Sequence, residues 1–206
     1  TVSGDFFDIL PLEGGRIGFC LGDVSGKGMN AALLMAKTAS LYRCLAKSVD
    51  RPGRLLSILN EEIVETATRG MFVTMVAGVY DTGTGMVCLA NAGHEPPLCH
   101  SRSGQFESFP AEAPPLGIVP GSEFPEAEVQ LDGDTLYTFS DGLTEAYSQS
   151  GGQLGSEGLQ RLIARSARTS LVERIDAILA GVKSLEARDD LTLLVVCGDC
   201  DCGDAQ

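Results

Sequence analysis

Apolar residues recur along the chain at two different spacings, which predict a mixture of β-strands and α-helices. Two apolar-rich runs flank residues 13–15 (Glu-Gly-Gly) and predict a β-hairpin with a glycine turn. Residues 81–85 (Asp-Thr-Gly-Thr-Gly) predict a second hairpin in the same way. Strands are expected at residues 6–12, 16–21, 73–80, 86–90, 97–100, 106–109, 135–139 and 191–197.

After Gly28 the apolar spacing approaches 3.6 residues, and Pro52 is a favourable first residue for the helix that follows it. Helices are expected at residues 29–47, 52–67, 158–166 and 171–184. Strands and helices therefore come in blocks and do not strictly alternate. This order favours antiparallel sheets with segregated helices, which is an α+β domain.

Length and composition predict one globular domain over residues 1–206, with 44% hydrophobic and 21% charged residues. No apolar run approaches the roughly 18 residues needed to cross a bilayer, so no direct membrane contact is expected. The chain begins Thr-Val-Ser-Gly, without Met, and runs directly into apolar sequence. We therefore expect a piece of a longer protein that carries a regulatory region before this domain.

The formal net charge of −13 argues against nucleic acid as a partner, because phosphate backbones would be repelled. A surface that binds cations or a basic protein fits this charge better than a surface that binds nucleic acid. A negative surface that only keeps the protein soluble fits it equally well.

The seven cysteines do not resemble a disulfide framework. Cys20, Cys44 and Cys88 lie in apolar stretches and are expected to be small core residues in a reducing, cytoplasmic compartment. The tail contains Cys197, Cys200 and Cys202 but lacks a second ligand pair at zinc-finger spacing. It is expected to be a frayed terminus that carries thiols.

Four aspartates stand at predicted strand ends or beside glycines, where a side chain can project from a rigid sheet: Asp5, Asp23, Asp141 and Asp189. Each alone would pass for an ordinary turn residue. Together they could supply the oxygen ligands that Mg²⁺ and Mn²⁺ prefer, from several segments of one chain.

Six stretches, in order and spanning nearly the whole chain, resemble the SpoIIE-type branch of the protein phosphatase 2C-like metal-dependent phosphatases. They are residues 3–8 (Ser-Gly-Asp-Phe-Phe-Asp), 22–28 (Gly-Asp-Val-Ser-Gly-Lys-Gly), 90–98 (Ala-Asn-Ala-Gly-His-Glu-Pro-Pro-Leu), 115–118 (Pro-Leu-Gly-Ile), 139–145 (Phe-Ser-Asp-Gly-Leu-Thr-Glu) and 188–192 (Arg-Asp-Asp-Leu-Thr). The resemblance implies a four-layer α-β-β-α sandwich, with two antiparallel sheets between outer helices.

The resemblance also implies two Mn²⁺ or Mg²⁺ ions and assigns their ligands; a third, weaker ion is left open. Asp23 bridges both ions, and the backbone carbonyl of Val24 completes one coordination shell. Asp141 and Asp189 complete the other shell, and Asp5 holds that second ion directly or through its waters. Supporting or positioning roles fall to Asp8, Gly142 and Asp190.

The implied activity is hydrolysis of phosphoserine or phosphothreonine on a protein by water that the two ions activate. The implied partner is a small phosphorylated regulator of the anti-anti-sigma type; dimerisation is left open. In the wider family a His follows the bridging Asp-Gly pair, but Ser25 stands there in this sequence. His94 is expected to have a structural role, in a turn at the end of a strand.

Two other functions remain compatible with the sequence. A degenerate domain of this fold would bind a phosphoprotein or sense metal without catalysis, but all the expected metal aspartates are present. A hydrolase of small phosphoesters would need a nucleoside or sugar pocket, for which the sequence has no signature.

Overall fold

The computed structural model describes residues 4–66, 70–147, 152–185 and 190–198. The chain divides into two compact units, which interleave along the sequence. Unit 1 comprises residues 1–96 and 109–131, and unit 2 comprises residues 97–108 and 132–206. Each unit consists of one antiparallel sheet and one pair of helices, so the predicted α+β class is confirmed.

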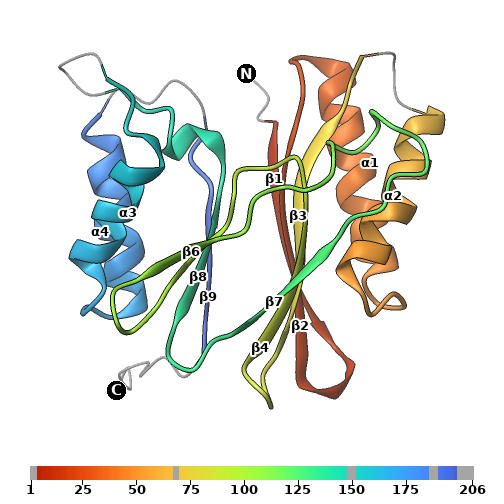
Figure 1. Cartoon of the computed structure of the whole chain (residues 1–206). Helices are drawn as coiled ribbons and strands as arrows, with labels where there is room; N and C mark the ends of the chain where they lie inside the picture. The colour runs from red at the N-terminus through yellow and green to blue at the C-terminus, as the bar shows by residue number, and fades with distance from the viewer. Residues whose placement is uncertain (1–3, 67–69, 148–151, 186–189, 199–206) are drawn as a thin grey trace. The chain divides into compact units, whose positions relative to one another are not determined.

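Unit 1 contains a five-stranded antiparallel sheet in the order β1-β2-β3-β4-β7. Helices α1 and α2 lie on the same face of this sheet (Figure 1). The predicted first hairpin is present, and Gly14 and Gly15 make its turn with φ of 72° and 74°. The elements are β1 Asp5–Leu12, β2 Arg16–Val24, α1 Met29–Leu45, α2 Pro52–Thr66, β3 Val73–Asp81, β4 Met86–Ala92 and β7 Glu126–Gln130.

The core of unit 1 lies between its sheet and its two helices. Alternation along β1 turns Phe6 and Leu10 into this core, where they join Leu56 and Leu59 of α2. Val24 at the end of β2 is also buried there. Neighbouring residues on these strands must therefore face the opposite side of the sheet, and Asp5 and Asp23 are two of them.

Unit 2 contains a four-stranded antiparallel sheet in the order β6-β5-β8-β9, with α3 and α4 packed on one face (Figure 1). Tyr137 and Phe139 of β8 are fully buried against Leu159 and Ile163 of α3. The elements are β5 Leu98–His100, β6 Phe106–Ser108, β8 Thr135–Phe139, the 3-10 turn Asp141–Leu143, α3 Gly155–Ser166, α4 Leu171–Lys183 and β9 Leu193–Cys197.

Strand β7 is the one strand of the described residues that the sequence pattern did not predict. Its residues, Glu-Ala-Glu-Val-Gln, are mostly poor strand formers, and only Val129 is buried. Pairing with β4 places Val129 opposite Val87, so tertiary contact stabilises this edge strand.

Two expectations about cysteines are wrong. Cys20 is fully buried as predicted, but Cys44 is exposed on α1, because the stripe of α1 that faces the sheet is filled by other residues. Cys197 is disulfide-bonded and therefore not a free thiol, while Cys200 and Cys202 lie outside the described residues. Within the described part of the chain, no helix is both long enough and apolar enough to span a membrane.

Candidate metal centre

Asp5 and Asp23 are direct partners across the β1–β2 pair. Opposite residues on antiparallel strands have Cβ atoms roughly 4.5–5.5 Å apart, so two carboxylates lie side by side here. Both point away from the face that α1 and α2 cover. Like charges directly opposite each other destabilise a sheet, and a bound cation would remove that cost.

The backbone around Gly4 brings further oxygen atoms to this position. Val24 donates its N–H to the Gly4 carbonyl at 3.2 Å. A Cβ added to Gly4 would lie 2.3 Å from Oδ1 of Asp23 and 3.1 Å from the Val24 carbonyl oxygen. The Asp23 carboxylate and the Val24 carbonyl therefore face the same small space, which only glycine at position 4 leaves open.

The loop after Val24 is held by Ser25. Its N–H donates to the Phe72 carbonyl at 2.9 Å, and its Oγ accepts from the Phe72 N–H at 2.8 Å. Gly26 and Gly28 have φ of 89° and 94°, which side chains other than glycine rarely adopt. Ser25 thus fixes the loop between β2 and α1.

Asn91 closes the turn that follows β4. Its Oδ1 accepts from the His94 N–H at 2.8 Å, and its Nδ2 donates to the carbonyls of His94 and Phe109 at 3.1 and 3.3 Å. The His94 ring is buried, and its Nδ1 lies 2.9 Å from Oγ1 of Thr74, the partner of Asp23 on β3. The strand-end turn predicted around His94 is therefore present.

Asp141 stands at the start of the 3-10 turn that follows β8 in unit 2. The buried Ser140 beside it donates to the Asp190 carbonyl at 3.2 Å and accepts from the Thr192 N–H at 3.1 Å. A Cβ added to Gly142 would lie 2.1 Å from the Asp190 carbonyl oxygen. These contacts bring the segment before β9 against the Asp141 turn.

The other predicted residues are placed as follows. Asp190 is exposed, and Asp189 lies outside the described residues. Asp8 lies on the opposite face of β1 from Asp5, where both its oxygens accept from Arg43 of α1, at 2.8 and 2.5 Å. Asp8 therefore ties α1 to β1 and is turned away from Asp23.

Sequence reasoning did not single out Gly4, Ser140 or Asn91 as parts of the site. All three lie inside the stretches that carry the family resemblance. The groups that they contact, however, are either far away in the sequence or backbone atoms, and neither kind of partner can be recognised from a motif. Their roles become visible only when those partners are in place.

The donors assembled in each unit are carboxylate and carbonyl oxygens, which suit Mg²⁺ or Mn²⁺ and not the softer metals. Across the described ranges, which leave out Asp189, no group of three or more His, Cys, Asp or Glu side chains converges on one point. The pair Asp5 and Asp23 belongs to unit 1, and the turn that carries Asp141 belongs to unit 2.

Three comparisons with known proteins bear on this arrangement. The phosphoserine phosphatase RsbU of Bacillus subtilis is 30% identical over 200 residues, which cover 95% of this chain. A crystal structure of the RsbU and RsbW domains of Rv1364c from Mycobacterium tuberculosis matches with a TM-score of 0.81 and 28% identity, over 94% of this chain and 55% of that one. RsbX, crystallised with magnesium, matches with a TM-score of 0.72 and 16% identity, over 95% and 87% of the two chains.

The chain spans 59% of the length of RsbU. The family model for stage II sporulation protein E (SpoIIE) matches residues 13–198, which include most of both units. The resemblance seen in the sequence motifs is thereby confirmed. The chain belongs to the SpoIIE family.

Proposed function

We propose that this chain is the catalytic domain of a metal-dependent protein phosphatase that hydrolyses phosphoserine or phosphothreonine on another protein. The observation that carries the proposal is the placement of Asp5 directly opposite Asp23, with the Val24 carbonyl facing the same space. An isolated sheet would avoid two adjacent carboxylates. The two carboxylates and the carbonyl oxygen beside them are the hard oxygen donors that Mg²⁺ or Mn²⁺ binds.

Two Mn²⁺ or Mg²⁺ ions would be held by Asp5, Asp23, the Val24 carbonyl, Asp141 and Asp189. When bound, such ions make hydroxide available near neutral pH and neutralise the charge of a phosphate ester. The magnesium in the RsbX crystals supports this class of metal.

The chain's own residues orient the proposed ligands. The Gly4 carbonyl accepts the Val24 N–H and so fixes the backbone that carries the Val24 carbonyl. Ser140 connects the Asp141 turn to residues 190 and 192, directly after Asp189 in the sequence. The Ser25 Oγ is engaged with the Phe72 N–H, so it is a structural group and not a nucleophile.

The substrate we propose is a phosphorylated regulatory protein of the anti-anti-sigma type, met in the cytoplasm. The name of RsbU as a phosphoserine phosphatase supports phosphoserine as the group attacked. The net charge of −13 makes nucleic acid an unsuitable substrate.

The test is release of phosphate from a phosphoserine peptide, a generic phosphate ester and a nucleotide, with Mn²⁺ or with chelator. Wild type is expected to need the metal and to prefer the peptide to the nucleotide. Asp23→Asn and Asp141→Asn should each lower the rate by about 100-fold or more, since even groups that only support metal ligands cost about 10–100-fold.

Asp81→Asn is the matched control. It removes the same charge at the far end of the unit 1 sheet, and the amide oxygen of Asn can still accept from the Gly83 and Thr84 N–H groups. Activity that survives chelation would contradict the metal mechanism. A wild type that binds Mn²⁺ but cleaves none of the substrates would be a binding module.

A further inference from the structure

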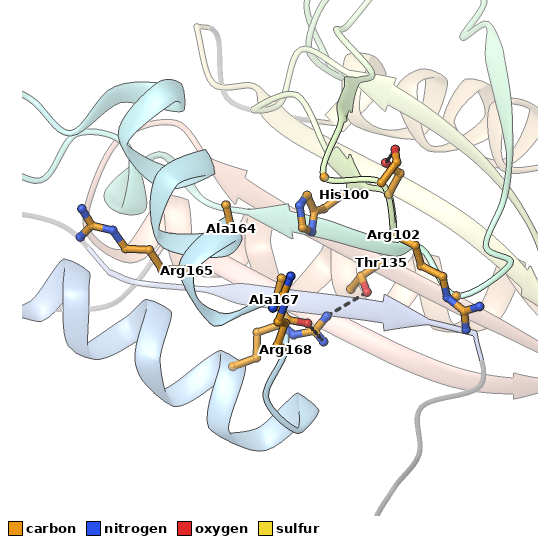
Figure 2. A pocket seen from close by; sticks show the side chains of 12 residues that line it. His100, Arg102, Thr135, Ala164, Arg165, Ala167 and Arg168 are labelled. Carbon is orange, nitrogen blue, oxygen red and sulfur yellow. Dashed lines mark hydrogen bonds between the residues drawn. The ribbon is translucent and has the colours of Figure 1, made fainter.

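Unit 2 contains a cavity of about 580 Å³ at the end of its sheet where β8 begins. The β5–β6 loop, the first residue of β8, the end of α3 and the start of α4 line it (Figure 2). Its polar lining includes the side chains of His100, Arg102, Thr135, Arg168 and Arg174.

The cavity is separate from the part of the candidate metal centre that unit 2 carries. Thr135 is the first residue of β8, and Asp141 follows the last one, Phe139. At roughly 3.3 Å per residue, the strand alone puts about 13 Å between Thr135 and Phe139. A ligand in this cavity would therefore not touch Asp141.

Of the five described arginines outside the cavity, all but Arg54 form an ion pair. Arg16, Arg43, Arg51 and Arg161 each form an ion pair with a carboxylate. Within the described residues, no ion pair is formed by any arginine that lines the cavity: Arg102, Arg165, Arg168 and Arg174. Figure 2 shows Arg165 extending away from His100 and Thr135, so three guanidinium groups remain as candidates.

Arg174 is held in place by neutral acceptors. One terminal nitrogen donates to Oγ1 of Thr135 at 3.0 Å and to Oη of Tyr137 at 3.2 Å, and the other donates to the Ala167 carbonyl at 2.9 Å. Its Nε is buried and has no acceptor. The positive charge of the half-buried Arg174 is thus fixed at the cavity wall by neutral acceptors, and no carboxylate of the described residues forms an ion pair with it.

The surrounding groups suit an anion of modest size. Arg102 and Arg168 are exposed and line the cavity, and the Arg102 guanidinium lies against Gly133, which also lines it. The buried His100 ring is stacked on Phe106 with ring centroids 4.5 Å apart, which gives one wall a flat aromatic surface. Burial, followed by the charge of Arg174, lowers the pKa of His100. The charge of Asp134, whose carboxylate accepts from the Arg102 N–H at 2.9 Å, opposes this shift.

We propose that this cavity binds a small molecule that bears a phosphate or pyrophosphate group. The terminal N–H groups of Arg174 are taken by protein acceptors, so Arg174 supplies a fixed positive charge at the cavity wall. The planar guanidinium groups of Arg102 and Arg168 would supply the paired hydrogen bonds that phosphate oxygens accept. A cavity of about 580 Å³ lies in the usual range for small-molecule sites. The site is independent of the proposed phosphatase activity and is not predicted by it.

The experiment is calorimetric titration with inorganic phosphate, pyrophosphate and a nucleoside diphosphate, at about 0.15 M salt to screen non-specific attraction. Chelator is present throughout, so that no cation can hold phosphate at the candidate metal centre. One-to-one binding of at least one probe is expected. A preference for the diphosphates over inorganic phosphate would identify a metabolite site, whereas equal binding would identify a phosphate site.

Arg102→Ala and Arg168→Ala test the location, because both residues are exposed and their loss leaves the core intact. Each is expected to weaken binding by about tenfold or more, as loss of a charge-assisted hydrogen bond does. Arg161→Ala is the matched control, since it removes the same charge from α3 outside the cavity. Absence of binding by wild type up to about 1 mM, or equal loss in all three variants, would overturn the proposal.

Discussion

Replacing Asp5 by Asn should stabilise the metal-free protein while reducing its response to metal. Asp5 and Asp23 are cross-strand partners, and like charges in this position are destabilising, by about 0.2–1 kcal/mol if the cost is of the size of other cross-strand pair energies. Removal of one charge relieves that cost. For a chain of 206 residues this corresponds to a rise in Tm of up to about 4 °C in chelator.

In Mn²⁺ the order should reverse. A ligand at about 100 times its Kd stabilises the folded state by about 2.7 kcal/mol, or roughly 5–10 °C in Tm for a chain of this size. Wild type should show a rise of this order, and Asp5→Asn should lose most of it. The assay is thermal unfolding followed by circular dichroism, in chelator and in Mn²⁺.

Asp8→Asn is the control on the same strand. It removes the same charge on the opposite face of β1, where the carboxylate is paired with Arg43. This variant should lower Tm in both buffers and keep the full response to Mn²⁺. If Asp5→Asn instead lowered Tm in chelator and kept the full Mn²⁺ response, the two carboxylates would not form a cation site.

Three further outcomes follow from the geometry. Gly142→Ala puts a Cβ 2.1 Å from the Asp190 carbonyl oxygen. The variant should therefore lose about 1–3 kcal/mol of stability against urea and most of its Mn²⁺-dependent activity. An unchanged unfolding curve in urea would contradict this contact. Asn91→Ala removes the hydrogen bonds that the Asn91 side chain makes in the buried turn at His94, and the free energy of unfolding in urea should decrease by about 2–4 kcal/mol. A decrease near zero would mean that water replaces the amide. Burial lowers the pKa of His100 from 6.5, so the unfolded chain takes up the proton first and the stability of the fold should decrease as the pH drops below about 6.5. His100→Gln should flatten this part of the plot of stability against pH. An unaltered plot would refute the role of His100 in this pH dependence.

Local sequence was sufficient for most of the secondary structure. Helix α1 begins at Met29 and α2 at Pro52, as the apolar spacing and the proline predict, and the glycine turn at 13–15 closes the first hairpin. Such features depend on residues a few positions apart, whose spacing directly reflects the period of a helix or a strand. The motif aspartates were identified from sequence for a related reason, since each stands beside a glycine or a strand end.

The register between strands was decided only by the tertiary structure. Nothing local to Asp5 or Asp23 says that they are opposite each other, and a slip of one residue would turn one carboxylate to the other face. The same holds for Asp8, to which the family resemblance gave a supporting or positioning role and which the structure pairs with Arg43.

Edge strand β7 and the arginine-lined cavity show the same limit. The sequence of β7 favours no strand, and it is the pairing of Val129 with Val87 that makes it one. Arg102 and Arg174 are separated by most of unit 2 in sequence, and packing of α4 against β8 brings both to one cavity. The sequence shows which residues could form a site, but contacts between remote segments determine which of these residues lie together. The reason is that burial of the apolar faces selects the strand register and the packing of the helices.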